Sequence, residues 1–261
     1  MKRRSPLDYA YAVGRVRSLE KFMIGRAAFR EAAEAPDTGS ALRILGAAGR
    51  LPEGFADVRT AAGLDAVLES EKQALGSLLA DILLDAEVLE IYNREDRPDR
   101  ALEAAKDFGS RFITDYLRSR IDLANIKIFL RSKYLELPAE RFRNSALRGG
   151  TLPADLFVAG YDGPAGEFGA KLASTPYGLL WERALRALEE RETFVVLERE
   201  IEDHGMALLK PAKYLVFGPE PVYAFGLAKK RELALVRIVA SGKIHGIPPA
   251  VLAERIGETY V

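Results

Sequence analysis

The 261-residue sequence contains no cysteine, two histidines and one tryptophan. Without cysteine the chain has no disulfide framework and no thiolate metal site, which fits a reducing, intracellular setting. His204 and His245 are isolated and form no HExxH motif, so a zinc enzyme is not expected. A G-x-S-x-G nucleophile motif is absent too. The phosphate-binding loop is also missing, because Arg237 stands where its first glycine would precede Gly242-Lys243. We therefore expect no catalytic, cofactor-binding or metal-binding residues.

The sequence also lacks long hydrophobic runs and an excess of charge of one sign. The most apolar stretch, residues 208–228, is interrupted by charged residues and three prolines. A transmembrane helix needs about 18 or more apolar residues, so we expect no membrane span. The basic N-terminus has no apolar core of the kind that a signal peptide needs. Lys plus Arg and Asp plus Glu both total 38, which argues against a dedicated nucleic-acid binder.

Apolar residues make up 48% of the chain, enough for a sizeable core, and they recur at helical spacing rather than in alternation. We expect an all-α fold of antiparallel long-helix pairs. The long helices are predicted at residues 8–35, 64–93, 99–134, 177–209 and 218–243. Short helices are predicted at residues 40–48, at 139–147 and at the C-terminus, and residues 154–175 are predicted to be loop with a short helix.

One stretch of sequence recurs, which indicates a supersecondary unit used more than once. Residues 121–138 (IDLANIKIFLRSKYLELP) align with residues 231–248 (RELALVRIVASGKIHGIP) at a shift of 110 positions. Lys133 falls on Lys243 and Pro138 on Pro248, while Asp122 falls on Glu232. A weaker third copy is expected at residues 8–25. The turn Gly149-Gly150-Thr151-Leu152-Pro153 likewise matches Ala48-Gly49-Arg50-Leu51-Pro52. We expect one all-α domain, residues 1–261, with two pseudo-equivalent lobes at about 1–150 and 151–261.

These repeat ends resemble the C subunit of A-type and V-type rotary ATPases, which is named d in eukaryotic V-ATPases. Asp122, Asn125 and Arg131 in DLANIKIFLRSKY are similar to the family pattern D..N...llR.ky. The segments 217–221, 242–249 and 258–261 resemble the closing part of the family. Residues 11–19 are similar to its opening ARVRALE.

The resemblance implies a funnel-like fold of three helical lobes, of which this chain holds two. It implies a protein without an active site of its own. Such a protein seats the rotor shaft on the membrane rotor ring and transmits torque for ATP-coupled proton or sodium transport. The implied partners are the ring and the central-stalk subunits, with membrane contact only through the complex. The implied location is peripheral, on the cytoplasmic face of the membrane.

Basic residues gather at the two repeat ends, while residues 182–203 hold eight acidic side chains against four arginines. Complementary charge would steer and orient a partner, but a solvated helix surface with local charge pairs explains the same pattern. The candidate interface residues are Arg131, Lys133, Arg141, Arg143, Arg148, Lys229, Lys230 and Lys243.

Other polar residues of the repeat have a predicted structural role. Asp122 and Asn125 lie one turn apart among apolar residues, so they are predicted to bond the start of a neighbouring helix; the alternative is an exposed polar stripe. The repeat-structural set is Asp122, Asn125, Pro138, Glu232 and Pro248.

The aromatic residues are predicted to pack in the core. Trp181 is expected to be buried. Tyr214, Phe217, Tyr223 and Phe225 are expected to pack together, and an exposed part of this group would mark a partner site.

Two further functions remain open. A helical-repeat scaffold for another partner would show an open stack with a concave groove. An all-α enzyme would show a pocket with perturbed carboxyl groups.

Overall fold

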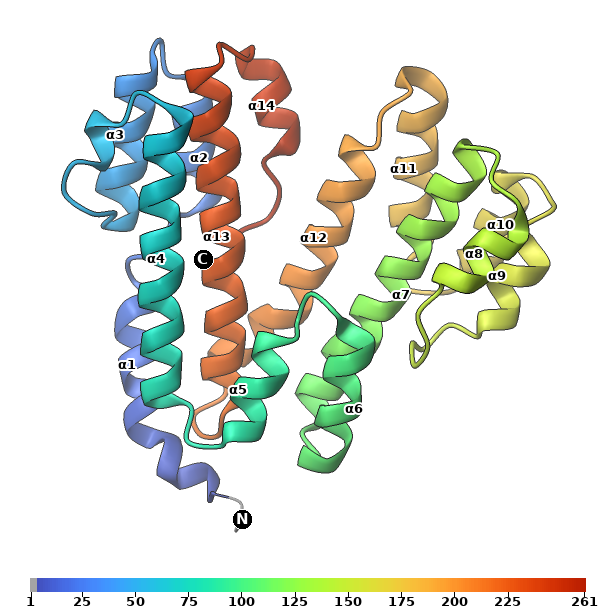
Figure 1. Cartoon of the computed structure of the whole chain (residues 1–261), viewed down its shortest axis with the longest axis horizontal. Helices are drawn as coiled ribbons and strands as arrows, with labels where there is room; N and C mark the ends of the chain where they lie inside the picture. Colours follow the sequence, from blue (N-terminus) through green and yellow to red (C-terminus); the bar gives the residue numbers. More distant parts are fainter. Residues whose placement is uncertain (1–3) are drawn as a thin grey trace. The chain divides into compact units, whose positions relative to one another are not determined.

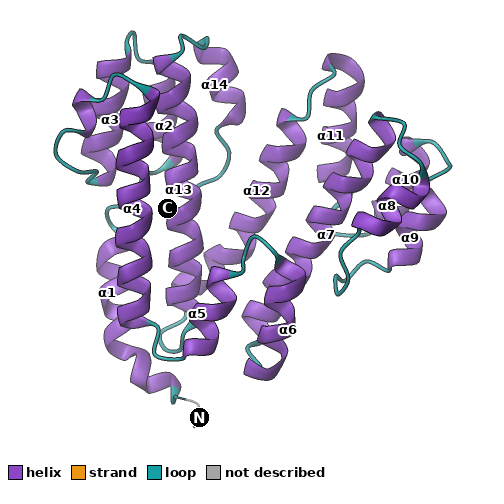
Figure 2. Cartoon of the chain, viewed as in Figure 1, coloured by secondary structure: helices purple, strands orange, loops and turns teal. Residues whose placement is uncertain are grey.

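The computed structural model describes residues 4–261. Within this range every regular element is a helix and no strand is present (Figure 2), which confirms the all-α prediction. The chain forms two compact units. Unit 1 comprises Met1–Tyr92 and Met206–Val261, and unit 2 comprises Asn93–Gly205. The predicted lobes 1–150 and 151–261 divide the chain by repeat, and that division stays a prediction.

Unit 1 brings both ends of the chain into one helical body. The helices α4 (Ala61–Ile82) and α13 (Glu220–Ile244) run antiparallel and side by side (Figure 1). Gly226 permits this close approach, because a Cβ there would lie 2.8 Å from the side chain of Leu79. The remaining elements of the unit are η1 (Pro6–Tyr9), α1 (Ala10–Glu20), α2 (Arg26–Glu34), α3 (Thr38–Gly49), η2 (Phe55–Asp57), α5 (Ala86–Asn93), η3 (Lys210–Tyr214) and α14 (Pro249–Arg255).

The core of unit 1 combines residues that are distant in sequence. Phe29 and Leu42, from the N-terminal helices, are fully buried against α4 and against Val236 and Leu252 near the C-terminus. Removing this apolar area from water is the main stabilising term. The N-terminal helix pair therefore depends on the C-terminal helices for its core.

Unit 2 is built around α7 (Arg111–Tyr134). The helix before it, α6 (Pro98–Phe108), packs along α7 after a turn at Gly109, whose φ of 75° suits glycine. Aromatic rings cluster near the C-terminal half of α7, where Phe129 stacks on Phe168 with ring centroids 4.1 Å apart. The remaining helices are α8 (Ala139–Ser145), α9 (Ala154–Gly160), α10 (Ala165–Leu172), α11 (Gly178–Arg191) and α12 (Val195–Leu209), the last of which crosses the boundary between the units.

Four predicted long helices are each two helices in the structure. The prediction 8–35 is divided at residues 21–25, the prediction 64–93 at residues 83–85, and the prediction 99–134 at Gly109-Ser110. The prediction 177–209 is divided where Glu192 adopts a left-handed conformation with a φ of 50°. Apolar spacing continues through each break, so it conceals the change of direction. Residues 154–175, predicted to be loop with one short helix, contain two helices, α9 and α10.

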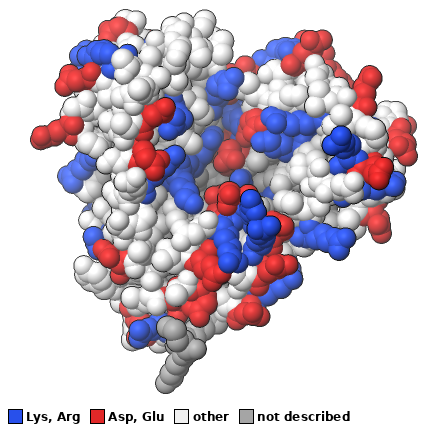
Figure 3. Space-filling view, in the orientation of Figure 1, with Lys and Arg blue, Asp and Glu red and all other residues white. Residues whose placement is uncertain are grey.

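Charged side chains of both signs are interspersed over the visible face of each unit (Figure 3). No helix within residues 4–261 is long and apolar enough to cross a membrane.

Candidate protein-interaction site

The two repeat helices, α7 and α13, end with the same backbone turn. The Leu137 N–H donates to the Ser132 carbonyl at 2.9 Å, and the Ile247 N–H donates to the Gly242 carbonyl at 2.8 Å. The preceding residue is left-handed in both, with a φ of 52° at Glu136 and 67° at Gly246. This is the Schellman arrangement that satisfies the last carbonyls of a helix. The 110-residue shift seen in the sequence therefore relates two equivalent helix ends.

A short helix follows each turn and packs back onto the repeat helix. Pro138 precedes α8, and Pro248 precedes α14, with nearly identical backbone angles. On α8, Phe142 is buried against Phe129 with ring centroids 5.4 Å apart. On α14, the equivalent Leu252 fills the space beside Gly242 that a side chain there would need. Both short helices are thus fixed by one buried apolar side chain.

The repeat lysines hold the C-terminal end of a second helix. Lys133 Nζ donates to the carbonyls of Tyr161 and Gly163, just after α9, at 2.5 and 2.6 Å. Lys243 Nζ donates to the carbonyls of Ala33 and Ala35 at the end of α2. A cation at this position offsets the negative end of the helix dipole. Both lysines, predicted as interface residues, therefore form contacts inside the chain.

The repeat carboxylates hold the chain just before that same second helix. Asp122, fully buried, accepts hydrogen bonds from the Thr151 and Leu152 N–H groups at 3.0 Å each and from the Tyr177 hydroxyl at 2.9 Å. Glu232 accepts from the Ile24 N–H at 2.7 Å. Burial raises the pKa of the Glu232 carboxyl, and the adjacent Lys229 ammonium acts in the opposite direction. These contacts support the structural role proposed for both carboxylates.

Asn125 has a similar bridging position in unit 2 alone. Its side-chain amide donates to the Leu147 carbonyl at 3.0 Å and accepts from the Leu147 N–H at 2.8 Å. The position 110 residues later is Leu235, which has no polar group to offer. The loop after α8 is therefore attached to α7 by a contact that unit 1 does not repeat.

These contacts show that α2 packs on α13 in the way that α9 packs on α7. The predicted match of the turns 48–52 and 149–153 is wrong as a backbone match, because the left-handed residue is Arg50, the third position, in the first turn and Gly149, the first position, in the second. The predicted third copy at residues 8–25 is also wrong as a structural unit. Its helix α1 ends at Glu20, and no residue from 20 to 25 has the left-handed conformation of the other two ends.

The remaining candidate cations differ in their availability to a partner. Arg131 pairs with Glu198 at 2.6 Å, Lys229 pairs with Glu232, and Lys230 lies 3.9 Å from the ring centroid of Tyr92. Three others are exposed on or just after α8, and within residues 4–261 their side chains form no hydrogen bond or ion pair: Arg141, Arg143 and Arg148. Leu135 and Leu137, 62% and 39% exposed, lie on the turn that leads to them.

The predicted aromatic group is divided between core and surface. Tyr223 and Phe225 are buried, whereas Tyr214 is 85% and Phe217 45% exposed. The prediction that all four pack together is therefore wrong for the two that lie before α13. Trp181 is buried as predicted, against Phe168 in unit 2.

Fold and site together define an all-α protein in which two equivalent helix ends are built by internal contacts, with exposed cationic and apolar side chains beside one of them. The family model described as ATP synthase (C/AC39) subunit matches residues 99–255, more than half of the chain. The chain belongs to this family. The match includes α7 with α8 and α13 with α14, the two repeat ends described above.

Curated relatives agree with this membership. The C subunit of the A-type ATP synthase of Thermococcus kodakarensis is 28% identical over 159 residues, covering 59% of this chain and 41% of the relative. Its counterpart in Thermococcus gammatolerans is 27% identical over 185 residues, covering 69% and 49%. The C subunit of the V-type sodium ATPase of Enterococcus hirae is 28% identical over 140 residues, covering 54% and 42%. The matched part of the chain therefore spans less than half the length of these relatives.

Proposed function

We propose that the chain is a non-catalytic central-stalk component of an A-type or V-type rotary ATPase. In this role it seats the rotor shaft on the membrane ring and transmits torque for ATP-coupled proton or sodium transport. The observation that carries the proposal is the family match over both repeat ends. The protein would lie peripherally on the cytoplasmic face of the membrane and contact the bilayer only through the complex.

The exposed end of α8 is the strongest candidate for the partner interface. The side chains of Arg141, Arg143 and Arg148 are free of hydrogen bonds and ion pairs within the described residues, and the exposed Leu135 and Leu137 lie beside them. A cationic rim around apolar side chains is a common arrangement of protein interfaces, in which charge guides association and apolar burial holds the complex. Lys133 and Lys243 are less suited to this role, because their ammonium groups already bind backbone carbonyls.

Affinity purification from native membranes tests the proposal. A tagged chain, expressed in its own host and solubilised in mild detergent, is expected to elute with rotor-ring and stalk subunits and with the ATP-hydrolysing head. The purified chain alone is expected to hydrolyse no ATP. Recovery of the chain without any ATPase subunit would overturn the proposal. Recovery with an unrelated partner would instead favour a helical-repeat scaffold.

A further inference from the structure

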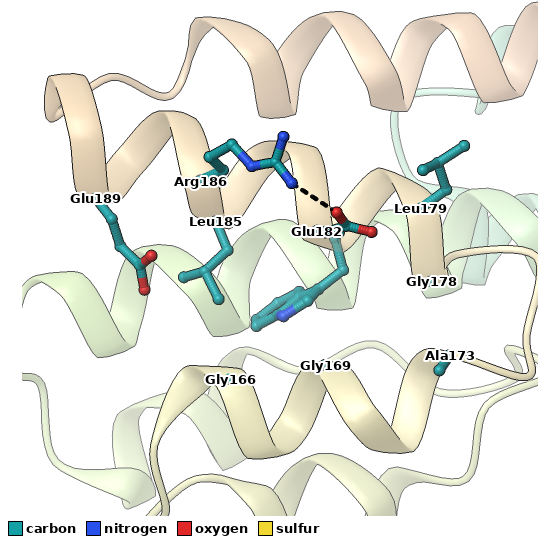
Figure 4. A pocket seen from close by; sticks show the side chains of 10 residues that line it. Gly166, Gly169, Ala173, Gly178, Leu179, Glu182, Leu185, Arg186 and Glu189 are labelled. Carbon is teal, nitrogen blue, oxygen red and sulfur yellow. Dashed lines mark hydrogen bonds and ion pairs between the residues drawn. The ribbon is translucent and has the colours of Figure 1, made fainter.

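A groove in unit 2 runs between α10 and α11, apart from the residues of the proposed interface (Figure 4). It has a volume of about 500 Å³, and its lining comes only from these two helices and the turn between them. On the α10 side the lining residues are small: Gly166, Gly169 and Ala173. Gly166 has open space where a side chain would be, with no atom within 4 Å. No side chain therefore projects into the groove from Gly166 on the α10 side.

The spacing of the lining residues matches the requirements of a third helix. The lining residues on the α10 side are spaced by three and then four positions along the chain. The same spacing separates the α11 residues Glu182, Leu185 and Glu189. Residues at this spacing form one face of a helix, the face that meets a partner in coiled-coil packing. In Figure 4, Leu185 and Glu189 extend from α11 toward the α10 side of the groove. Small residues on such a face allow another helix backbone to approach closely.

Trp181 forms part of the groove and carries an unpaired polar atom. Trp181 lines the groove and is only 1% exposed, yet its indole Nε1–H has no hydrogen-bond partner. The Nε1 atom lies beside Gly169, 2.8 Å from the position of a Cβ built there. A buried donor without an acceptor costs free energy, because its hydrogen bond to water has been lost. Because the Nε1 atom is packed against Gly169 and has no exposed surface, a partner outside the chain does not reach it, and the indole instead contributes apolar surface to the groove.

The rim of the groove is acidic. Glu182 is already paired with Arg186 at 2.7 Å. Glu189 lies two turns further along α11, is exposed, and forms no ion pair within residues 4–261. The net charge of these three side chains is negative, which favours a cationic partner and disfavours an acidic one.

We propose that this groove seats an amphipathic helix of another protein. Its apolar stripe packs on the open surface at Gly166 and on the indole of Trp181, and a Lys or Arg faces Glu189. The proposal uses none of the residues assigned to the rotary-ATPase interface, so it holds or fails separately from that function.

The single tryptophan makes the groove directly observable. The full chain is titrated with a Trp-free peptide of about 18 residues, five helical turns, that carries leucine on one face and Lys and Gln on the other. A saturable change in Trp181 fluorescence is expected. A peptide with Glu in place of Lys keeps the apolar stripe and is expected to bind about tenfold more weakly.

Two pairs of variants locate the binding site. Gly166→Leu fills the open space on α10 and is expected to weaken binding of the basic peptide by at least about tenfold. Gly76→Leu, at an exposed glycine of α4 with equally open space, is expected to leave it unchanged. Glu189→Lys is expected to weaken binding by about tenfold. Glu190→Lys, one residue along and outside the groove, is expected to stay within about twofold of the unaltered protein.

Three outcomes would overturn the proposal. The first is the absence of a saturable fluorescence change, and the second is unaltered binding by folded Gly166→Leu. The third is a concentration-dependent fluorescence change without peptide, accompanied by dimers in sedimentation. That result would show that a second copy of the chain occupies the groove.

Discussion

Two buried carboxylates, Asp122 and Glu232, organise the units at the scale of single residues. Asp122 accepts hydrogen bonds from two backbone N–H groups, and Glu232 from one, in the segment that precedes a second helix. Their polar character and their positions in the repeat could be predicted from the sequence, and so could a bond to a neighbouring helix. The identities of their partners could not, because Ile24 and Glu232 are brought together only by the folding of unit 1.

Asp122→Ala is expected to reduce the free energy of unfolding by about 3 kcal/mol, because two buried backbone N–H groups lose their acceptor. Trp181 lies in the same unit, so urea unfolding followed by its fluorescence measures the change. Asp115→Ala, on the exposed face of the same helix, is expected to stay within about 0.5 kcal/mol of the unaltered protein. Equal effects of the two substitutions would contradict a bridging role for Asp122.

Because the Glu232 carboxyl is buried, we expect the free energy of unfolding to depend on pH. Burial raises the pKa of this carboxyl above the usual 4.5, so the folded state binds this proton more tightly than the unfolded state. The resulting stabilisation is complete below pH 4.5 and is lost as the pH rises through the native pKa. Glu232→Gln has no such proton. The stability of the unaltered protein relative to this variant should therefore fall as pH rises; a constant or rising difference in chemical unfolding would refute the assignment.

At the scale of elements, the sequence predicts helix type and the repeat ends better than the helix boundaries. The break at Glu192 has no glycine or proline to mark it, although the residue is left-handed. The small-residue face of α10 is visible in the sequence as glycines at close spacing, but glycine-rich composition favours a loop prediction there. The packing of α2 on α13 joins the two ends of the chain, so no local pattern could predict it.

The turns that end α7 and α13 differ in the type of residue at their left-handed position. Glu136 is a non-glycine residue in the left-handed region, where Gly246 stands in the other copy. Glu136→Gly is expected to stabilise the protein by about 1 kcal/mol, and Gly246→Ala to destabilise it by about 1 kcal/mol.

Gly76→Ala, in the right-handed interior of α4, is the control for this comparison and is expected to stabilise the protein by about 0.5–1 kcal/mol. Thermal and urea unfolding measure all three. A stabilising Gly246→Ala would show that the turn does not require the left-handed conformation.

At the scale of the whole molecule, the family match covers most of unit 2 and the C-terminal helices of unit 1 but not the first 98 residues. Those residues nevertheless complete the core of unit 1 together with α13 and α14. The predicted two-lobed relation to longer relatives remains a prediction. The interface proposal therefore depends on the repeat ends, which are the part that the match and the geometry share.

Reversing the charge of the exposed cations tests that interface. A triple variant is expected to reduce recovery with the ATPase by at least about tenfold, because charge complementarity becomes repulsion. Quantitative co-purification at low salt measures the loss, and circular dichroism should show an unchanged helical fold. The substitutions are Arg141→Glu, Arg143→Glu and Arg148→Glu.

A matched triple variant controls for net charge. It reverses three exposed arginines outside the proposed interface and is expected to co-purify normally. An equal loss in this control would mean that overall charge, and not the end of α8, governs assembly. The control substitutions are Arg15→Glu, Arg30→Glu and Arg118→Glu.

The most direct test of the proposed role is photocrosslinking from the end of α8 in the intact complex. Because the chain has no cysteine, Arg143→Cys can carry a single photoreactive label, with Ser70→Cys on the exposed face of α4 as the control site. The label at residue 143 is expected to form crosslinks to rotor-ring or central-stalk subunits, and the label at residue 70 far fewer. Crosslinks from residue 143 to no ATPase subunit, in preparations that contain the complex, would contradict the account.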